Sequence, residues 1–290
     1  MNTDWSDHVQ GINTLYTSRE LRFHDLFKDR YLPIFSLPND RPLRILEIGC
    51  GPGALAQALK RWYPQSEIVG IDRDTAFIEY ARAHVSDVCF LEGDATQLPF
   101  ADGTFDVTIS NTVSEHIEPK AFYGEQMRVL KPDGICIVIS ARRGYHHMAS
   151  CLDENEYEHA FWKKVQQHDH SMETYHVCQY PLNEMEHPKV MAAHGFRNIT
   201  TGYALIDLTP DDPKYSCEIA LKMIESGRGN DLDAVHSALK SLPEHISREE
   251  AEQMTAMINE KYNRRISLYL AGEKQWNTYV SIALIIRGTK

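Results

Sequence analysis

Leu46-Glu47-Ile48-Gly49-Cys50-Gly51-Pro52-Gly53-Ala54 is the stretch of this 290-residue chain that decides its fold. The apolar run that leads into it predicts a strand over 44–48, and the helical spacing after it predicts a helix over 54–62. Three glycines therefore stand at a turn from strand to helix. There the missing Cβ lets the backbone approach a ligand, and the start of the helix presents unpaired N–H groups. The stretch predicts a ligand-binding turn.

The spacing of the glycines and the acidic residue before them indicate which ligand fits. A dinucleotide loop reads G-x-G-x-x-G, whereas this chain has G-x-G-x-G with Glu47 inside the preceding strand. A carboxylate at that place would repel a pyrophosphate but attract an ammonium or sulfonium group. Asp72 and Asp94 follow the next two predicted strands, and the carboxyl ends of parallel strands meet at one edge of a sheet. We expect these residues to share one ligand, with Asp72 accepting the hydroxyls of a ribose.

Short β-rich runs alternate with helical patterns, which is typical of a parallel sheet wrapped by helices. The predicted fold class is α/β: a Rossmann-like, doubly wound, seven-stranded, mostly parallel sheet with N-terminal helices and helical cap insertions. The strands are expected at 44–48, 67–71, 88–91, 105–110, 135–140, 197–208 and 276–286. Three parts are expected: an N-terminal helical lid segment over 1–41, a ligand-binding core over 42–143, and cap insertions plus the last strands over 144–290.

Two insertions interrupt the second half of this pattern. Residues 144–185 are expected to be irregular apart from one helix near 157–167, and their aromatic residues indicate a cap over the cleft. Helices over 212–227 and 248–270 are expected to form the second insertion, separated by a loop from Gly227 to Asp233.

The composition is that of a water-soluble globular protein, with 42% hydrophobic residues, 24% charged residues and a mean hydropathy of −0.42. The formal net charge of −11 would repel a polyanion, so nucleic acid is not expected as a partner. The N-terminus lacks the pattern of a signal peptide, and no apolar run is long enough to span a membrane. We expect a cytoplasmic monomer or homodimer that does not act on membranes.

Five motifs in a fixed order make the chain similar to a known family. They are Ile45-Leu46-Glu47-Ile48-Gly49-Cys50-Gly51-Pro52-Gly53, Gly93-Asp94-Ala95, Leu98-Pro99-Phe100, Phe105-Asp106-Val107 and Arg128-Val129-Leu130-Lys131-Pro132-Asp133-Gly134. Together they resemble the class I S-adenosylmethionine (SAM)-dependent methyltransferases, in particular the small-molecule type that includes quinone-biosynthesis and related metabolite enzymes. The resemblance covers the chain from about Leu43 to Ser140. Asp133 departs from it, because the family usually has glycine there.

The resemblance implies SAM as the cofactor and gives each part of SAM its own contacts. The implied contacts are Gly49, Gly51 and Gly53 with the methionine moiety and ribose, Glu47 with the amino group, Asp72 with the ribose hydroxyls, Arg73, Asp94 and the Ala95 N–H with adenine, and Asn111 and Thr112 with the methionine end. The segment 16–22 also looks like the leading helix that folds over the cofactor in such enzymes. In it, Tyr16 or Arg22 is expected to donate to the SAM carboxylate, unless both are simply solvated helix residues.

Methyl transfer from a sulfonium is an in-line displacement, so positioning and exclusion of water are the main help a protein gives. A base matters only if the acceptor must lose a proton. His116, just beyond the fourth strand, is a candidate general base, and the alternative is a structural histidine that holds the loop. His146, just after the fifth strand, is a second candidate. The cluster of His168, His170, His176 and Cys178 fits no zinc spacing, so no metal is expected.

The motifs together favour a SAM-dependent methyltransferase that acts on an O, N or S atom of a small-molecule acceptor. A non-catalytic SAM-binding regulatory protein is the alternative from another class, since it would keep the same cofactor residues. A nucleotide-cofactor oxidoreductase is disfavoured by the glycine spacing and by Glu47. The sequence of the two insertions carries no motif that identifies the acceptor.

Overall fold

The computed structural model describes residues 5–175 and 177–290, without the side chains of residues 8, 141–147, 171 and 172. Within them, seven strands form one sheet in the order β3-β2-β1-β4-β5-β7-β6. The first five pair in parallel, and β7 lies antiparallel between β5 and β6. The strands are β1 (Arg44–Ile48), β2 (Glu67–Asp72), β3 (Cys89–Glu92), β4 (Phe105–Asn111), β5 (Leu130–Ala149), β6 (Arg197–Leu208) and β7 (Thr278–Thr289). The doubly wound, mostly parallel sheet is confirmed.

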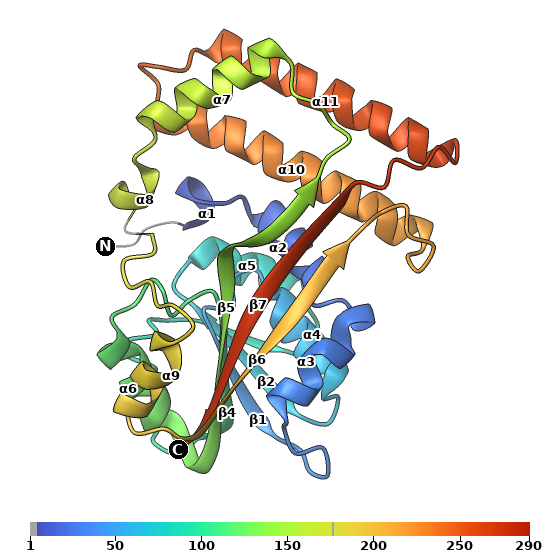
Figure 1. Cartoon of the computed structure of the whole chain (residues 1–290). Helices are drawn as coiled ribbons and strands as arrows, with labels where there is room; N and C mark the ends of the chain where they lie inside the picture. The colour runs from blue at the N-terminus through green and yellow to red at the C-terminus, as the bar shows by residue number, and fades with distance from the viewer. Residues whose placement is uncertain (1–4, 176) are drawn as a thin grey trace.

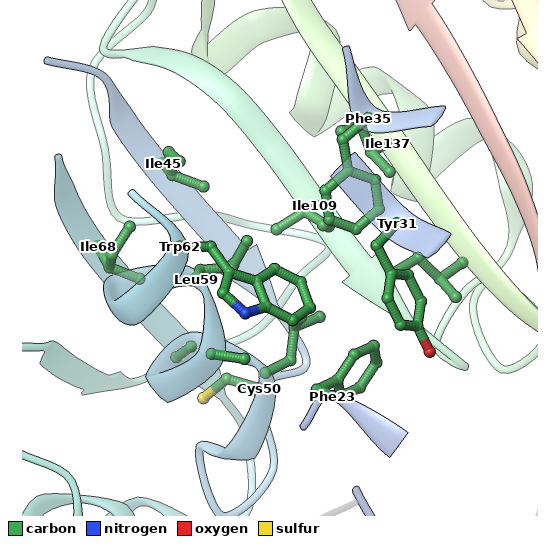
Figure 2. Packing of buried hydrophobic residues seen from close by; sticks show 14 of the residues in the cluster. Phe23, Tyr31, Phe35, Ile45, Cys50, Leu59, Trp62, Ile68, Ile109 and Ile137 are labelled. Atoms are coloured by element: carbon green, nitrogen blue, oxygen red, sulfur yellow. The ribbon is translucent and has the colours of Figure 1, made fainter. Parts of the chain in front are cut away.

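Helices cover both faces of the sheet, as expected for its unbroken apolar central strands. One face packs on α3 (Lys28–Phe35), α4 (Ala54–Trp62) and α5 (Thr75–His84), and the other on α6 (Pro119–Val129) and α9 (Glu186–Ala193). Figure 2 shows the first of these cores, where the rings of Tyr31 and Trp62 stack with their centroids 5.7 Å apart. The N-terminal helices therefore belong partly to the sheet core.

The fifth strand differs from its expected bounds at both ends. It begins at Leu130 rather than Ile135, with residues 131–134 bulging out of the ladder, and there Asp133 takes a φ of 60°. That left-handed conformation is one that glycine adopts without strain. The strand continues to Ala149, where an irregular segment was expected, because antiparallel pairing with β7 supplies hydrogen-bond partners for its backbone.

A helical cap formed by α7 (Glu156–His168), α10 (Cys217–Ser241) and α11 (Arg248–Leu270) lies beyond the end of β5 (Figure 1). These helices share a hydrophobic cluster of their own. The expected loop from Gly227 to Asp233 is wrong, since α10 runs through it unbroken. A Cβ on Gly227 would lie 2.9 Å from the hydroxyl of Tyr262, and one on Gly229 would lie 3.2 Å from Oγ1 of Thr14. These glycines allow close packing between helices rather than a break.

The N-terminal segment runs between the cap and the sheet (Figure 1). It consists of α1 (Trp5–His8), α2 (Ile12–Arg22) and the 3-10 helix η1 (Asp25–Phe27). Helix α2 contacts both α10 and α4, and the Lys222 ammonium bonds the Glu20 carboxylate at 3.0 Å. A short helix, α8 (Ser171–Thr174), follows α7. None of the described helices has the length and apolarity needed to cross a bilayer.

Candidate functional site

The glycine turn lies at the carboxyl end of β1. Gly49, Gly51 and Gly53 have φ values of 67°, 51° and 90°, in the region that favours glycine. A Cβ on Gly49 would lie 2.4 Å from Val113, whereas one on Gly51 would lie 3.6 Å from Leu15 of α2, its one contact within 4 Å among the described atoms. The first glycine is therefore required by packing as well as by conformation, and the second faces the leading helix.

Two carboxylates lie under this turn. Glu47 is only 2% exposed, and its Oε2 has no hydrogen-bond partner among the described residues. Burial and the charge of Asp72 raise the pKa of Glu47 well above its usual 4.5. Asp72 accepts the N–H groups of Gly51 at 2.8 Å and Asp74 at 3.0 Å, and burial raises its pKa. An ammonium beside Glu47 would satisfy the orphaned oxygen and favour the ionised carboxylate, so the turn fits a cationic ligand.

The remaining predicted cofactor residues follow the next strands. Asp94 is exposed after β3 and accepts the Thr96 N–H at 2.7 Å, while Ala95 beside it is half-buried. Arg73 is exposed after β2, and Asn111 is half-buried at the last position of β4. Strands β2 and β4 pair with β1 in parallel and β3 pairs in parallel with β2, so their carboxyl ends share the edge that holds the glycine turn.

The two arginines of the leading helix lie at different places. Arg22 lies over the ring of Tyr279 at 6.0 Å, toward β7. Arg19, which the sequence did not single out, donates to Oγ1 of Thr112 at 3.1 Å. Burial lowers the pKa of Arg19 to about 9, so an anion beside it would be favoured. The signal that could have found it is its helical spacing, three residues from Tyr16.

Tyr16 lies over the first helix that follows the glycine turn. Its hydroxyl donates to Oε1 of Gln57 on α4 at 3.0 Å, and its ring packs against Tyr80 on α5. The side chain therefore holds α2 onto the helices beside the turn. Its expected contact with the SAM carboxylate stays a prediction.

His116 joins the sheet edge to the segment after α8. Its Nδ1 accepts the N–H of Cys178 at 2.8 Å, and its ring packs edge to face against Trp5 with the centroids 4.8 Å apart. Because Nδ1 accepts this bond, a neutral ring carries its proton on Nε2. His116 thus connects the loop after β4 to the segment after α8, and its role as a general base stays a prediction.

The side chain of the second candidate base, His146, lies outside what the structure describes. The backbone of His146 pairs with Ser281 in the β5–β7 ladder, but its side chain is not among the described ones. His176 of the suspected metal cluster is not described either. Within the described part of the chain, no three metal-binding side chains converge, and the ring of His168 stacks on His245 at 3.7 Å.

The N-terminal segment and the segment after α8 close over the strand ends. The Ser6 N–H donates to the Asp74 carboxylate at 2.8 Å, which ties α1 to the start of α5. On the other side, the Tyr180 N–H donates to the carbonyl oxygen of Glu115 at 2.9 Å. Segments that are far apart in the sequence thus meet beside the carboxyl ends of the strands.

The middle of the chain matches known proteins. Residues 46–138 match the family described as a methyltransferase domain. A fatty-acid O-methyltransferase of Mycolicibacterium smegmatis is 36% identical over 106 residues, which are 35% of this chain and 38% of that enzyme. A demethylmenaquinone methyltransferase of Thermus thermophilus is 41% identical over 103 residues, 34% of this chain and 47% of that enzyme. The chain thus matches less than half of the length of these relatives.

A solved structure extends the likeness beyond the matched region. Phosphoethanolamine N-methyltransferase 2 of Haemonchus contortus, in complex with S-adenosyl-L-methionine, has a TM-score of 0.53 and 16% identity. The match covers 99% of this chain and 59% of that one. At this identity the likeness shows a shared fold.

Proposed function

We propose, from the premise that residues 46–138 form a class I methyltransferase domain, that the protein transfers the methyl group of SAM to an O, N or S atom of a small-molecule acceptor. The observation that carries the proposal is the orphaned, buried Oε2 of Glu47 beneath the glycine turn. A buried acceptor without a partner costs free energy, and the ammonium of the SAM methionine moiety would remove that cost.

The other parts of SAM find partners along the same edge. Asp72 would accept the ribose hydroxyls, and Asp94 the adenine amine. Arg19 would bind the carboxylate, since it is the cation that α2 holds against Thr112 at the end of β4. Arg22 is left out of this role because it lies over Tyr279.

The chain's own residues would act on the reaction mainly by holding the reactants in line. The acceptor's lone pair forms the new bond to the methyl carbon as the bonding pair returns to sulfur, which leaves a neutral thioether. SAM supplies an already activated methyl group, so orientation and a dry cleft contribute most. The bridges from Ser6 to Asp74 and from Tyr180 to Glu115 support such a closed cleft.

Two alternatives make different demands on the molecule. A non-catalytic SAM-binding regulatory protein needs no acceptor pocket, and a screen of small molecules with SAM, read by mass spectrometry, separates it from the enzyme. An oxidoreductase would have to place a pyrophosphate near Glu47, which charge repulsion opposes. A cytoplasmic location and a monomeric or dimeric state stay predictions.

Calorimetry with S-adenosylhomocysteine and NAD tests the cofactor assignment. The wild type should bind S-adenosylhomocysteine and not NAD, and Asp72→Ala should weaken binding by about 1.5–3 kcal/mol through lost hydrogen bonds to a charged acceptor. As a control, Asp40→Asn removes one negative charge from an exposed loop, as Asp72→Ala removes one from the site, and it should leave the affinity unchanged. Binding of NAD with no response to SAM would contradict the proposal.

A further inference from the structure

Helix α2 holds two arginines, Arg19 and Arg22, one turn apart beside the carboxyl end of β4. Among the described residues, neither guanidinium forms an ion pair with a carboxylate. Burial and the charge of Arg22 lower the pKa of Arg19, and the charge of Glu115 offsets only part of this. The undescribed side chains of β5, residues 141–147, include no acidic one. Two cations held in this way favour anionic ligands.

The two arginines reach different parts of the same edge. Strands β5 and β7 run on together beyond the carboxyl end of β4 (Figure 1). The Thr112 N–H donates to the carbonyl oxygen of Ile139 at 2.8 Å, so this extension begins directly beside the end of β4. Arg22 lies over the ring of Tyr279 on the extension, whereas Arg19 bonds Thr112. The pair therefore spans from the expected methionine end of SAM to the neighbouring extension of the sheet.

The SAM carboxylate accounts for one of these two positive charges. Arg19 has that carboxylate as its proposed partner, which leaves Arg22 with the ring of Tyr279. A ring face attracts a cation but provides no oxygen for the N–H donors of a guanidinium. Those donors form a fork that matches the paired oxygens of a carboxylate or a phosphate. Arg22 therefore fits an anionic group of a second ligand next to SAM.

Apolar surface adjoins this guanidinium. Tyr279 and Met148 are direct partners in the antiparallel ladder of β5 and β7, so their side chains project from the same face. Leu208, the partner of Tyr279 on β6, packs against the core that contains Leu21 of α2, so this face of the extension is turned toward α2. Met148 is 65% exposed. A ligand whose anionic group binds Arg22 could cover this apolar surface with the rest of its body.

We propose that the methyl acceptor is an anionic molecule, whose carboxylate or phosphate group binds Arg22 while its apolar body lies over Tyr279 and Met148. The inference rests on the proposed function. The contact with Arg22 orients the acceptor beside the methyl group and takes no part in the bond changes of the transfer.

Four probes with one hexyl-type chain test the charge preference: hexanoate, hexyl phosphate, 1-hexanol and hexylamine. Each is titrated calorimetrically into the full chain saturated with S-adenosylhomocysteine. One of the two anions should bind at least about tenfold more tightly than the alcohol, and the amine more weakly than the alcohol, because opposite charges attract. Comparison of the two anions shows which group Arg22 takes. The full chain also carries every undescribed residue, Asp4 included, so any partner that these residues supply is present in the measurement.

Two outcomes of the probe series would overturn the inference. One is that neither anion binds. The other is that the alcohol or the amine binds as tightly as the better anion.

Variants locate the preference at Arg22. Arg22→Gln should lower the anion-to-alcohol ratio by about fivefold or more and leave the affinity for S-adenosylhomocysteine within about twofold. Arg19→Gln should instead weaken the binding of S-adenosylhomocysteine. Arg248→Gln removes the same charge from an exposed position of α11 and should change neither quantity. A ratio that persists in Arg22→Gln contradicts the assignment. So does a loss of S-adenosylhomocysteine affinity in Arg22→Gln as large as that in Arg19→Gln, because Arg22 would then be a cofactor ligand.

The same titrations distinguish this inference from the proposed function. A protein that binds S-adenosylhomocysteine but shows no preference for the anions contradicts only the inference. A protein that does not bind S-adenosylhomocysteine contradicts the proposed function, whatever its preference among the probes. If a variant unfolds in a thermal scan, the wild-type probe series still decides.

Discussion

The sheet edge from β1 to β4 and the cap of α7, α10 and α11 differ in how well the local sequence pattern predicts their helices and strands. In the first region the local pattern predicts every helix and strand from 44 to 111 to within one residue of its observed bounds. In the cap, a loop expected at Gly227–Asp233 is the middle of a 25-residue helix. The first region follows residue preferences within each element, whereas the second depends on which helix packs against which.

The largest expected effect tests how firmly the cap is tied to the sheet. Asp211 and Arg265 form a buried ion pair at 2.6 Å, and Asp211 also accepts the backbone N–H of Trp276 before β7. Asp211→Ala should lower the free energy of unfolding by about 3–5 kcal/mol, because it leaves a buried guanidinium unpaired. Denaturant unfolding measures this. If the cap is a separate unit, hydrogen exchange should rise in α11 and not in the glycine turn.

A matched double variant separates charge from packing in that pair. Asp211→Ala with Arg265→Met removes both charges, and it should be less destabilised than Asp211→Ala alone. A double variant at least as unstable as the single one would show that the side-chain volumes, rather than the unpaired charge, hold the cap.

Two glycine substitutions compare the cap with α6, a helix that covers the sheet. Gly227→Ala would push a methyl group against the Tyr262 hydroxyl, which bonds Asp231 at 2.9 Å, and should destabilise the fold by about 1–2 kcal/mol. Gly124 is exposed on α6, where a Cβ would meet no described atom within 4 Å, so Gly124→Ala should stabilise by about 0.5–1 kcal/mol. Thermal unfolding should show shifts of opposite sign. Equal shifts would mean that α10 does not need the close contact.

Substitutions of His116 test the contact between the loop after β4 and the segment after α8. If His116 is a general base, its removal should lower turnover by about 10²–10⁴-fold. No replacement side chain that cannot accept a proton near pH 7 would restore turnover. If His116 instead positions the loop, His116→Ala should lower turnover by about tenfold. His116→Asn, whose amide oxygen can accept the Cys178 N–H, should keep turnover within about threefold of the wild type. The readouts are turnover and its pH profile. A steep loss in both variants would restore the base assignment.

The smallest effect is a proton released on binding. Burial and the charge of Asp72 raise the pKa of Glu47 in the folded, ligand-free protein. At a pH between the pKa of Glu47 in the unfolded chain and its pKa in the folded protein, the folded protein therefore keeps a proton that the unfolded chain has lost. In that window stability falls as the pH rises. The ligand's ammonium lowers this pKa, so S-adenosylhomocysteine should release up to about one proton.

Titrations in buffers of different ionisation enthalpy measure that proton. Glu47→Gln should abolish the release and stabilise the ligand-free protein at neutral pH. Identical proton release by the wild type and Glu47→Gln would place the cation elsewhere in the site.

The sequence alone determined the glycine turn, the acidic strand ends, the five parallel strands and the resemblance of the middle region to methyltransferases. These features depend on restrictions that act within a few residues, such as the positive φ of Gly49 and the apolar period of a strand. Only the tertiary structure decided that Arg19 rather than Arg22 reaches Thr112, and that Gly227 lies inside a helix. It also decided which nitrogen of His116 is occupied. Each of these depends on a partner far away in the chain, and local patterns hold no information about which distant atoms will meet.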